Sequence, residues 1–177
     1  INRVLRAGAD KVVINTSAIQ NPGFITQASR AFGSSTIVIG IEASKQSDNT
    51  YLAYTDNGRE HTGVNAVSWA EEVQSRGAGE ILLTSIDQEG TGNGFDLKLI
   101  KEVSKVLNIP LIAHGGASKN SHIYESIKSG SDGVAIASML HYSSLKRNPK
   151  NLFDYNNETN NFMSYISNNS CIMFNII

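Results

Sequence analysis

Short apolar runs alternate with helix-like segments along most of the chain. Each run is rich in Val, Ile and Leu at consecutive positions, which is typical of strands buried on both faces. The five predicted strands span residues 11–14, 37–41, 81–83, 111–113 and 134–137. Strands that alternate with helices favour a parallel sheet with right-handed crossovers. An open doubly wound sheet and a (β/α)8 barrel both fit this order, although five strands are too few to close a barrel of eight.

Cap residues mark where the intervening helices begin. Asn21 followed by Pro22 predicts an N-cap and a first helical turn, and Asn65 is a second predicted N-cap. Ile123 and Ile127 stand four residues apart in a later segment. This spacing predicts a helix with both residues on its apolar face.

One segment interrupts the alternation of strands and helices. Residues 51–55 and the run that starts at residue 59 flank the sequence Asp-Asn-Gly at 56–58. An Asn-Gly turn between two such runs is a strong hairpin signal. We predict a hairpin excursion on a loop, outside the core sheet. Asn57 and His61 are then expected to be solvated.

Composition narrows the classes of function. The chain has 177 residues, a formal net charge of −1 and 40% hydrophobic residues, as expected for one soluble globular domain. This balance of charge gives no support for nucleic-acid or membrane-surface partners, and no apolar run is long enough to cross a bilayer. The single cysteine, Cys171, excludes an intramolecular disulfide framework and fits a reducing, cytoplasmic compartment.

The composition changes near residue 148. We predict one α/β domain over residues 1–147 and an Asn-rich tail over residues 148–177, in which Phe162, Tyr165 and Ile166 would allow one last helix. The chain starts at Ile1 in what reads as the end of a helix, so we expect a fragment or a processed piece.

A βαβ unit near the end of the domain carries the first candidate chemistry. Its first strand stops at Gly115-Gly116, and its second strand, which includes Ala137, stops at Ser138. Small residues at the carboxyl ends of strands leave backbone N–H groups open to an anion. We interpret the unit as a phosphate cradle. The alternative is that Gly115-Gly116 forms only a tight turn.

An internal repeat points to a second anion site. Residues 5–16 can be laid on residues 127–138 with a constant offset, 130 − 8 = 122, so that Thr16 corresponds to Ser138. Two related strand ends of this kind suggest a substrate with a phosphate at each end. The alternative is two ordinary helix–Gly–strand junctions.

Several separate stretches resemble one family, the cyclase subunit of imidazole glycerol phosphate synthase from histidine biosynthesis. They read GADKVVINTSA, RGAGEILLTSID, GTGNGFD, IPLIAHGGA and AIASMLHY, and the resemblance covers residues 1–142. It implies an incomplete (β/α)8 TIM-type barrel with strands four to eight present. The first three strands, one of which carries another catalytic aspartate in the family, would be absent. The chain is therefore expected to be inactive by itself.

The resemblance also implies a reaction. The family joins ammonia from a glutamine amidotransferase (glutaminase) subunit to a bisphosphorylated ribulosyl aminoimidazole-carboxamide intermediate. It converts this intermediate to imidazole glycerol phosphate and an aminoimidazole-carboxamide ribotide, and it uses no cofactor. By position, Asn15 and Thr16 correspond to binders of one phosphate, and Thr84 to an active-site residue on strand six. The residues implied for the other phosphate are Gly90, Gly115, Gly116, Ala137 and Ser138.

Glu42 is the main departure from the family pattern. The strand over residues 37–41 ends at Glu42, where the family usually has the aspartate that acts as general acid/base. Glu keeps the carboxylate and extends it by one methylene, which matters because proton transfer needs hydrogen-bond reach. A surface glutamate after a strand is the alternative, although the carboxyl ends of barrel strands are catalytic positions.

Three further residues stand at strand ends without a fixed role. A small hydroxyl residue is common in the family at His114, which could bind a phosphate or fill space. Asp87 and Glu89 could bear on catalysis or cap their loop. The histidines lack a spacing partner for a metal, so no metal site is expected.

Two other functions remain open from the residues alone. Glu42 and His114 favour a paralogue that uses the same ammonia chemistry on another substrate, for example in glycan modification. The missing first strands favour a non-catalytic, phosphate-binding half-barrel.

Overall fold

Five parallel strands form the centre of the molecule. The computed structural model describes residues 1–141, and its parallel strands are β1 (Val12–Ile14), β2 (Ile37–Lys45), β5 (Glu80–Ser85), β6 (Leu111–His114) and β7 (Gly133–Ala135). The sheet order is β4-β3-β2-β5-β6-β7, and β1 pairs with β2. All pairs among β1, β2, β5, β6 and β7 are parallel, which confirms the predicted incomplete barrel.

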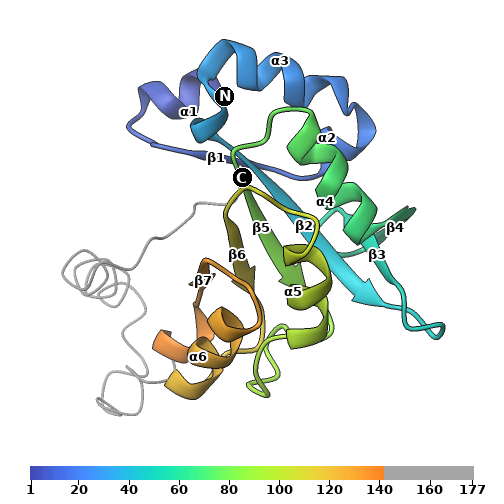
Figure 1. Ribbon diagram of the computed structural model, residues 1–177. Coiled ribbons are helices and arrows are strands. Elements are labelled where there is room, and N and C mark those ends of the chain that lie inside the picture. The colour runs from blue at the N-terminus through green and yellow to red at the C-terminus, as the bar shows by residue number, and fades with distance from the viewer. Residues whose placement is uncertain (142–177) are drawn as a thin grey trace.

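Helices connect these strands, as the sequence predicts. They are α1 (Asn2–Arg6), α2 (Thr16–Gln20), α3 (Gly23–Phe32), α4 (Ala66–Ser75), α5 (Leu97–Ser104) and α6 (Asn120–Lys128), with a 3-10 turn, η1, at Ser34–Thr36. Figure 1 shows α4 and α5 in front of the sheet and α3 across its upper end. The predicted cap at Asn65 is confirmed, since its side chain accepts from the N–H groups of Val67 and Ser68.

The hairpin is a correction to the sequence analysis. β2 does not end at Glu42 but continues to Lys45, and β3 (Tyr51–Thr55) pairs with this extension in antiparallel fashion. β4 (Glu60–Asn65) then pairs with β3. Tyr51 and Ala53 are buried in the main core, so the hairpin widens the sheet and is not a loop excursion. The residues of β3 alternate between buried and partly exposed positions, as in a strand with one face on a core.

Two helix predictions are also wrong in detail. The N-cap of α3 is Pro22 and not Asn21, and no side chain caps this helix. On α6 the buried residues are His122 and Ser126, while Ile127 is 45% exposed. Ser126 is held inside because its hydroxyl pairs with that of Ser131 at 2.8 Å, which turns the isoleucine face outward.

The strands separate two environments. Odd-numbered residues of β2, β5 and β6, such as Ile39, Ile81 and Leu111, pack in one core cluster with the helices. Because successive side chains of a strand point to opposite faces, the even-numbered residues face the other side, which is the barrel interior. At the amino-terminal end of that side, Lys11 forms an ion pair with Glu80, whose second carboxylate oxygen is buried without a partner.

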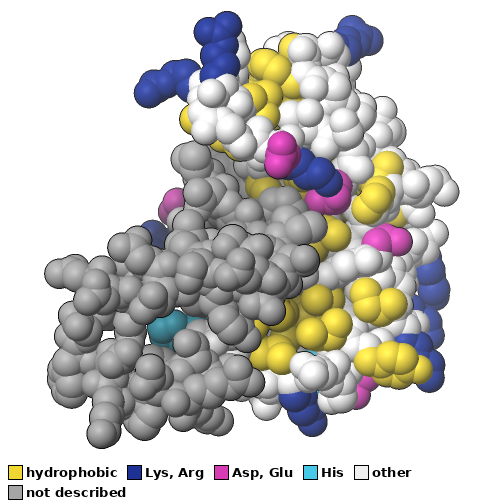
Figure 2. Space-filling model, turned by 90° about the vertical axis from the view of Figure 1, so that its left-hand side faces the viewer, with side chains coloured by type: hydrophobic (Ala, Val, Ile, Leu, Met, Phe, Trp, Pro, Cys, Tyr) yellow, Lys and Arg dark blue, Asp and Glu magenta, His cyan; other side chains and the backbone are white. Residues whose placement is uncertain are grey.

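Some predictions lie outside the described residues. These are the boundary at residue 147, the Asn-rich tail over 148–177 with its last helix, and the role of Cys171. Within residues 1–141, no helix is long and apolar enough to cross a membrane. Figure 2 shows Lys and Arg side chains scattered over the visible face, without one extended basic surface.

Candidate functional site

A row of residues crosses the sheet near the carboxyl ends of its parallel strands. Glu42 on β2 pairs in register with Thr84 on β5, Thr84 with His114 on β6, and His114 with Ala135 on β7. Residues paired in register on neighbouring strands point their side chains to the same face of the sheet. Since Glu42 faces the barrel interior, its paired neighbours Thr84, His114 and Ala135 do so too. The sheet thus brings together three of the residues that the sequence singles out.

Thr84 and His114 are in direct contact. The Thr84 hydroxyl lies 3.2 Å from Nδ1 of His114. Burial lowers the pKa of His114, and the negative charge of Glu89 opposes this shift only in part. The imidazole is therefore neutral near pH 7, with one nitrogen able to donate and the other able to accept a hydrogen bond.

Glu42 carries a partly buried carboxylate whose pKa is raised above its ordinary value. Burial raises its pKa, the backbone N–H of Gly58 lowers it through a hydrogen bond, and the charges of Glu89 and Asp56 raise it further. Its Oε2 atom is buried and has no hydrogen-bond partner among the described residues. A buried oxygen of this kind is costly unless a ligand or water satisfies it, so it marks a site where a donor group can bind.

Asn15 and Thr16 lie beside this row, directly after β1. Asn15 Nδ2 donates to the carbonyl oxygen of Tyr54 at 3.2 Å, while Asn15 Oδ1 is buried and has no partner in the described part of the chain. A Cβ on Gly40 would crowd Val13 Cγ1 at 3.1 Å but would meet the Cβ of Asn15 only in ordinary contact, at 3.6 Å. The Oδ1 atom of Asn15 is thus a second unsatisfied acceptor, on the strand next to that of Glu42.

The two glycines after β6 fit closely against the loop that follows β5. A Cβ on Gly115 would lie 2.8 Å from the carbonyl oxygen of Ser85, and one on Gly116 would lie 2.2 Å from that of Gly94. Both glycines have positive φ angles, +100° and +96°. Gly116 also accepts from the N–H of Gly94 at 2.8 Å. Tight packing alone therefore requires glycine at both positions. This supports the alternative that Gly115-Gly116 forms a tight turn, without excluding a phosphate cradle.

Within residues 1–141, the backbone N–H groups needed for a phosphate cradle are not taken up by the main chain. No backbone carbonyl of the described residues accepts from the N–H of Gly116 or of Ser138. Ala137 and Ser138 begin a helical turn, because the N–H groups of Leu140 and His141 both bond to Ala137 O. Gly90 is exposed with a φ of +75° and open space around it. The cradle stays a prediction.

Asp87 and Glu89 separate into two different roles. Asp87 braces its loop against β2, since its carboxylate accepts from Ser44 Oγ at 2.9 Å and from Lys45 N–H at 2.7 Å. Glu89 is exposed, and its charge acts on both Glu42 and His114. Asp87 therefore holds the loop, while Glu89 sets the electrostatic potential at the mouth of the site.

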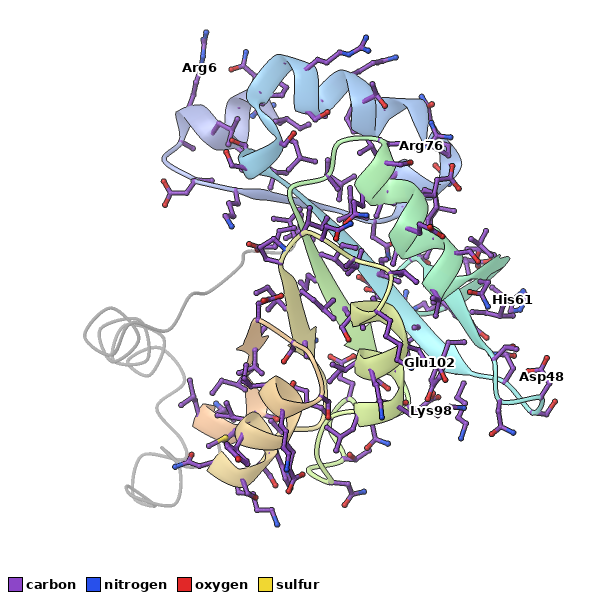
Figure 3. All side chains as sticks on the ribbon, viewed as in Figure 1. Arg6, Asp48, His61, Arg76, Lys98 and Glu102 are labelled. Atoms are coloured by element: carbon purple, nitrogen blue, oxygen red, sulfur yellow. The ribbon has the colours of Figure 1, made fainter. Side chains whose placement is uncertain are left out.

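Sequence reasoning missed Tyr54, which the hairpin brings to the site, while Asn57 and His61 are exposed as it predicted. Tyr54 pairs with both Glu42 and His61, and the rings of Tyr54 and His61 meet edge to face with centroids 5.5 Å apart. Figure 3 shows His61 on β4, at the outer side of the hairpin. The aromatic and apolar residues of β3, Tyr51-Leu52-Ala53-Tyr54, were the available signal. Within the described part of the chain, no group of three His, Cys, Asp or Glu side chains is arranged to hold a metal ion.

Comparisons with known proteins give one consistent result. A family model described as "Histidine biosynthesis protein" matches residues 1–146. Proteins named imidazole glycerol phosphate synthase subunit HisF are similar over most of the chain. The relative from Pyrobaculum aerophilum is 49% identical over 78% of this chain and 54% of its own length. The relative from Sulfurisphaera tokodaii is 47% identical over 82% of this chain and 58% of its own length. The relative from Prochlorococcus marinus strain MIT 9515 is 50% identical over 80% of this chain and 56% of its own length. The chain thus spans a little over half the length of these curated relatives.

Proposed function

Because the chain belongs to the histidine biosynthesis protein family, we propose that it forms the carboxyl-terminal part of the barrel of a cyclase subunit of imidazole glycerol phosphate synthase. The substrate would be the bisphosphorylated ribulosyl aminoimidazole-carboxamide intermediate. The products would be imidazole glycerol phosphate and the aminoimidazole-carboxamide ribotide. The enzyme would be a lyase that works without a cofactor.

One observation carries this proposal: the buried, unpartnered carboxylate oxygen of Glu42 lies in register with Thr84 on the interior face. A general acid/base must gain and lose a proton near the working pH. Burial raises the pKa of Glu42 in that direction. Glu42 would therefore move the proton during ring closure, and Thr84 with neutral His114 would orient the reacting groups by hydrogen bonds.

The phosphate groups would bind on either side of this carboxylate. Asn15 and Thr16, after β1, would hold one phosphate. The second would lie against the N–H groups of Gly116 and Ser138, which no backbone carbonyl of residues 1–141 engages, together with Gly90, Gly115 and Ala137. The internal repeat supports this division, since it relates Thr16 to Ser138. Backbone N–H groups at strand and helix ends suit phosphate oxygens because they present aligned donors.

The nitrogen for the new ring would come from a glutaminase partner as ammonia. The names of the relatives support this, because each is a subunit of a synthase. The chain spans a little over half of each relative, so the proposed activity belongs to the complete barrel. We expect the 177-residue chain to be inactive without the strands that correspond to the first three of the family.

The test is a steady-state assay with the bisphosphate intermediate and ammonium. The protein would be the chain joined to the first three strand–helix units of a HisF relative. Glu42→Gln keeps the shape but removes proton transfer, so kcat should fall by about 10²–10⁴-fold with little change in KM. Glu42→Asp should retain much of the turnover. If Glu42→Gln turns over like the parent, Glu42 is not the acid/base and the proposal loses its main catalytic support.

A further inference from the structure

The turn of the β3–β4 hairpin contacts both residues that follow β1. The carbonyl oxygen of Tyr54 accepts from Asn15 Nδ2 at 3.2 Å, and the N–H of Asp56 donates to Thr16 Oγ1 at 3.3 Å. These contacts join segments about 40 residues apart in sequence. The hairpin turn is therefore part of the wall of the site on the side of β1.

The same turn reaches Glu42 on the neighbouring strand. Tyr54 stands directly opposite Glu42 in the β2–β3 ladder, and the N–H of Gly58 donates to the Glu42 carboxylate. Gly58 is seated against Ile86, because a Cβ on Gly58 would lie 3.2 Å from Ile86 Cδ1. Ile86 is itself fixed, since its N–H donates to Ala43 O at 2.9 Å. The position of the Gly58 N–H is thus set by packing on β2 and on the loop after β5.

The backbone of the turn is held in an uncommon conformation. Asp56, Asn57 and Gly58 have successive positive φ angles of 52°, 56° and 76°. A left-handed residue other than glycine costs about 1 kcal/mol, and such conformations persist where surrounding contacts determine them. The turn is closed by the Arg59 N–H, which donates to the carbonyl oxygens of Thr55 and Asp56 at 3.1 and 3.3 Å. The contacts to Thr16, Glu42 and Ile86 hold it against the site.

We propose that the hairpin turn over residues 54–58 is a positioning element of the site, which aims the Glu42 carboxylate and links it to Asn15 and Thr16. This inference rests on the proposed function for its catalytic meaning. The sequence alone predicts a solvated loop without a role for this hairpin, and the proposal gives it one.

The charges around Glu42 allow a direct test on the full 177-residue chain. Asp56 faces Glu42 from the turn, Glu89 faces it from the loop after β5, and His114 lies one strand beyond Thr84. Asp56→Asn removes one negative charge and keeps the backbone N–H that bonds Thr16. Asparagine tolerates a positive φ well, so the turn should stay folded.

Removing a negative charge favours the ionised form of Glu42, so Asp56→Asn should lower the pKa of its carboxyl. NMR titration of the Glu42 side chain measures this value without any enzymatic assay. The matched control is Asp48→Asn, which removes the same charge from the tip of the β2–β3 turn, beyond the end of β2 and away from the 54–58 turn (Figure 3). The control should leave the Glu42 titration unchanged. Equal titration curves in all three proteins would overturn the proposal.

A second pair of variants tests positioning rather than charge. Gly58→Ala adds a methyl group against Ile86 and strains a φ of +76°, which should displace the turn. Gly63→Ala imposes similar strain, at φ +74°, in the same hairpin but meets nothing within 4 Å. In the complete barrel, Gly58→Ala should lower kcat by about 10- to 100-fold with KM little changed. Ile86→Ala should restore part of the loss, and Gly63→Ala should behave like the parent.

The two readouts separate failure of this inference from failure of the proposed function. If the complete barrel shows no cyclase activity, the NMR titrations of Asp56→Asn and Gly58→Ala still decide whether the turn positions Glu42. If Gly58→Ala and Gly63→Ala change the Glu42 titration and kcat equally, the hairpin acts only through general stability and the inference is wrong.

Discussion

The Thr84 hydroxyl lies 3.2 Å from Nδ1 of His114, across two parallel strands whose pairing places the two residues side by side. This contact fixes the orientation of the imidazole and uses one of its nitrogens. Because the ring is neutral near pH 7, the other nitrogen keeps a single defined role, as donor or as acceptor, towards the interior of the barrel.

His114 should make the stability of the chain depend on pH. Burial lowers its pKa from the ordinary value of 6.5, so the unfolded state binds a proton that the folded state rejects. Stability from this group is therefore present above pH 6.5 and is lost as the pH falls below it. In His114→Gln, urea unfolding at pH 7.5 and pH 5 should differ less than in the parent. His61→Gln, which changes an exposed histidine, should keep the parent's difference.

Glu42 should act on stability in the opposite sense. Its pKa is raised above 4.5, so between the unfolded and folded values the folded state holds the extra proton. Stability then falls as the pH rises through this window, and the loss persists at neutral pH. Glu42→Gln should raise the melting temperature relative to the parent at pH 7 and lose this advantage near pH 4. A lower melting temperature at pH 7 would mean that the buried carboxylate is already satisfied.

Gly116 should be the least replaceable glycine of the site. An alanine there places Cβ 2.2 Å from Gly94 O at a φ of +96°, so the loop after β5 must move. We expect a loss of about 2–4 kcal/mol in the free energy of unfolding, in the range of overpacking plus backbone strain. Gly8→Ala has a similar φ of +106° but open space, and should cost about 1 kcal/mol. Urea denaturation of both variants measures the difference.

Phosphate or sulfate should perturb two separate groups of amides. Titration of the chain followed by amide NMR should shift Gly116 and Ser138 as one group and Asn15 and Thr16 as another. Thr16→Val should abolish the second response and leave the first. Shifts confined to residues outside these two groups would contradict the cradle assignment.

The ion pair between Lys11 and Glu80 lies at the opposite end of the strands. Removing Lys11 alone should cost more stability than replacing both partners. Lys11→Met leaves the Glu80 carboxylate buried and unpaired, so we expect a loss of about 1–3 kcal/mol in the free energy of unfolding. Adding Glu80→Gln to Lys11→Met should recover part of it. Thermal or urea unfolding of the single and double variants forms the cycle. Additive losses would show that the pair contributes nothing by its interaction.

The parallel core could be predicted because its signal is local. Val, Ile and Leu at consecutive positions mark strands such as β2 and β5 without reference to their partners. The carboxyl-end rule then predicts that Glu42, Thr84 and His114 share one edge of the sheet. The structure has these three residues in one row.

The rest depends on contacts between distant segments. Pairing of Tyr51 with Lys45 places β3 beside an extension of β2 that carries no apolar signal. The bracing role of Asp87 follows from the same extension, because it bonds to Ser44 and Lys45. The buried face of α6 was predicted wrongly from its isoleucines. Ser126 is buried there because its hydroxyl pairs with that of Ser131, and Ile127 is left exposed.

Glu42 lies at a point where β2 is paired on both sides, with Tyr54 on β3 and with Thr84 on β5. Its main chain cannot shift without breaking two ladders at once. Evolutionary change at this position is therefore confined to the length and chemistry of the side chain. An exchange between Asp and Glu moves the carboxylate by about 1.5 Å while every neighbouring amide stays where it was. Divergence of substrate preference in such a barrel would then proceed by changes of reach at a fixed anchor, with the backbone of the strand kept constant.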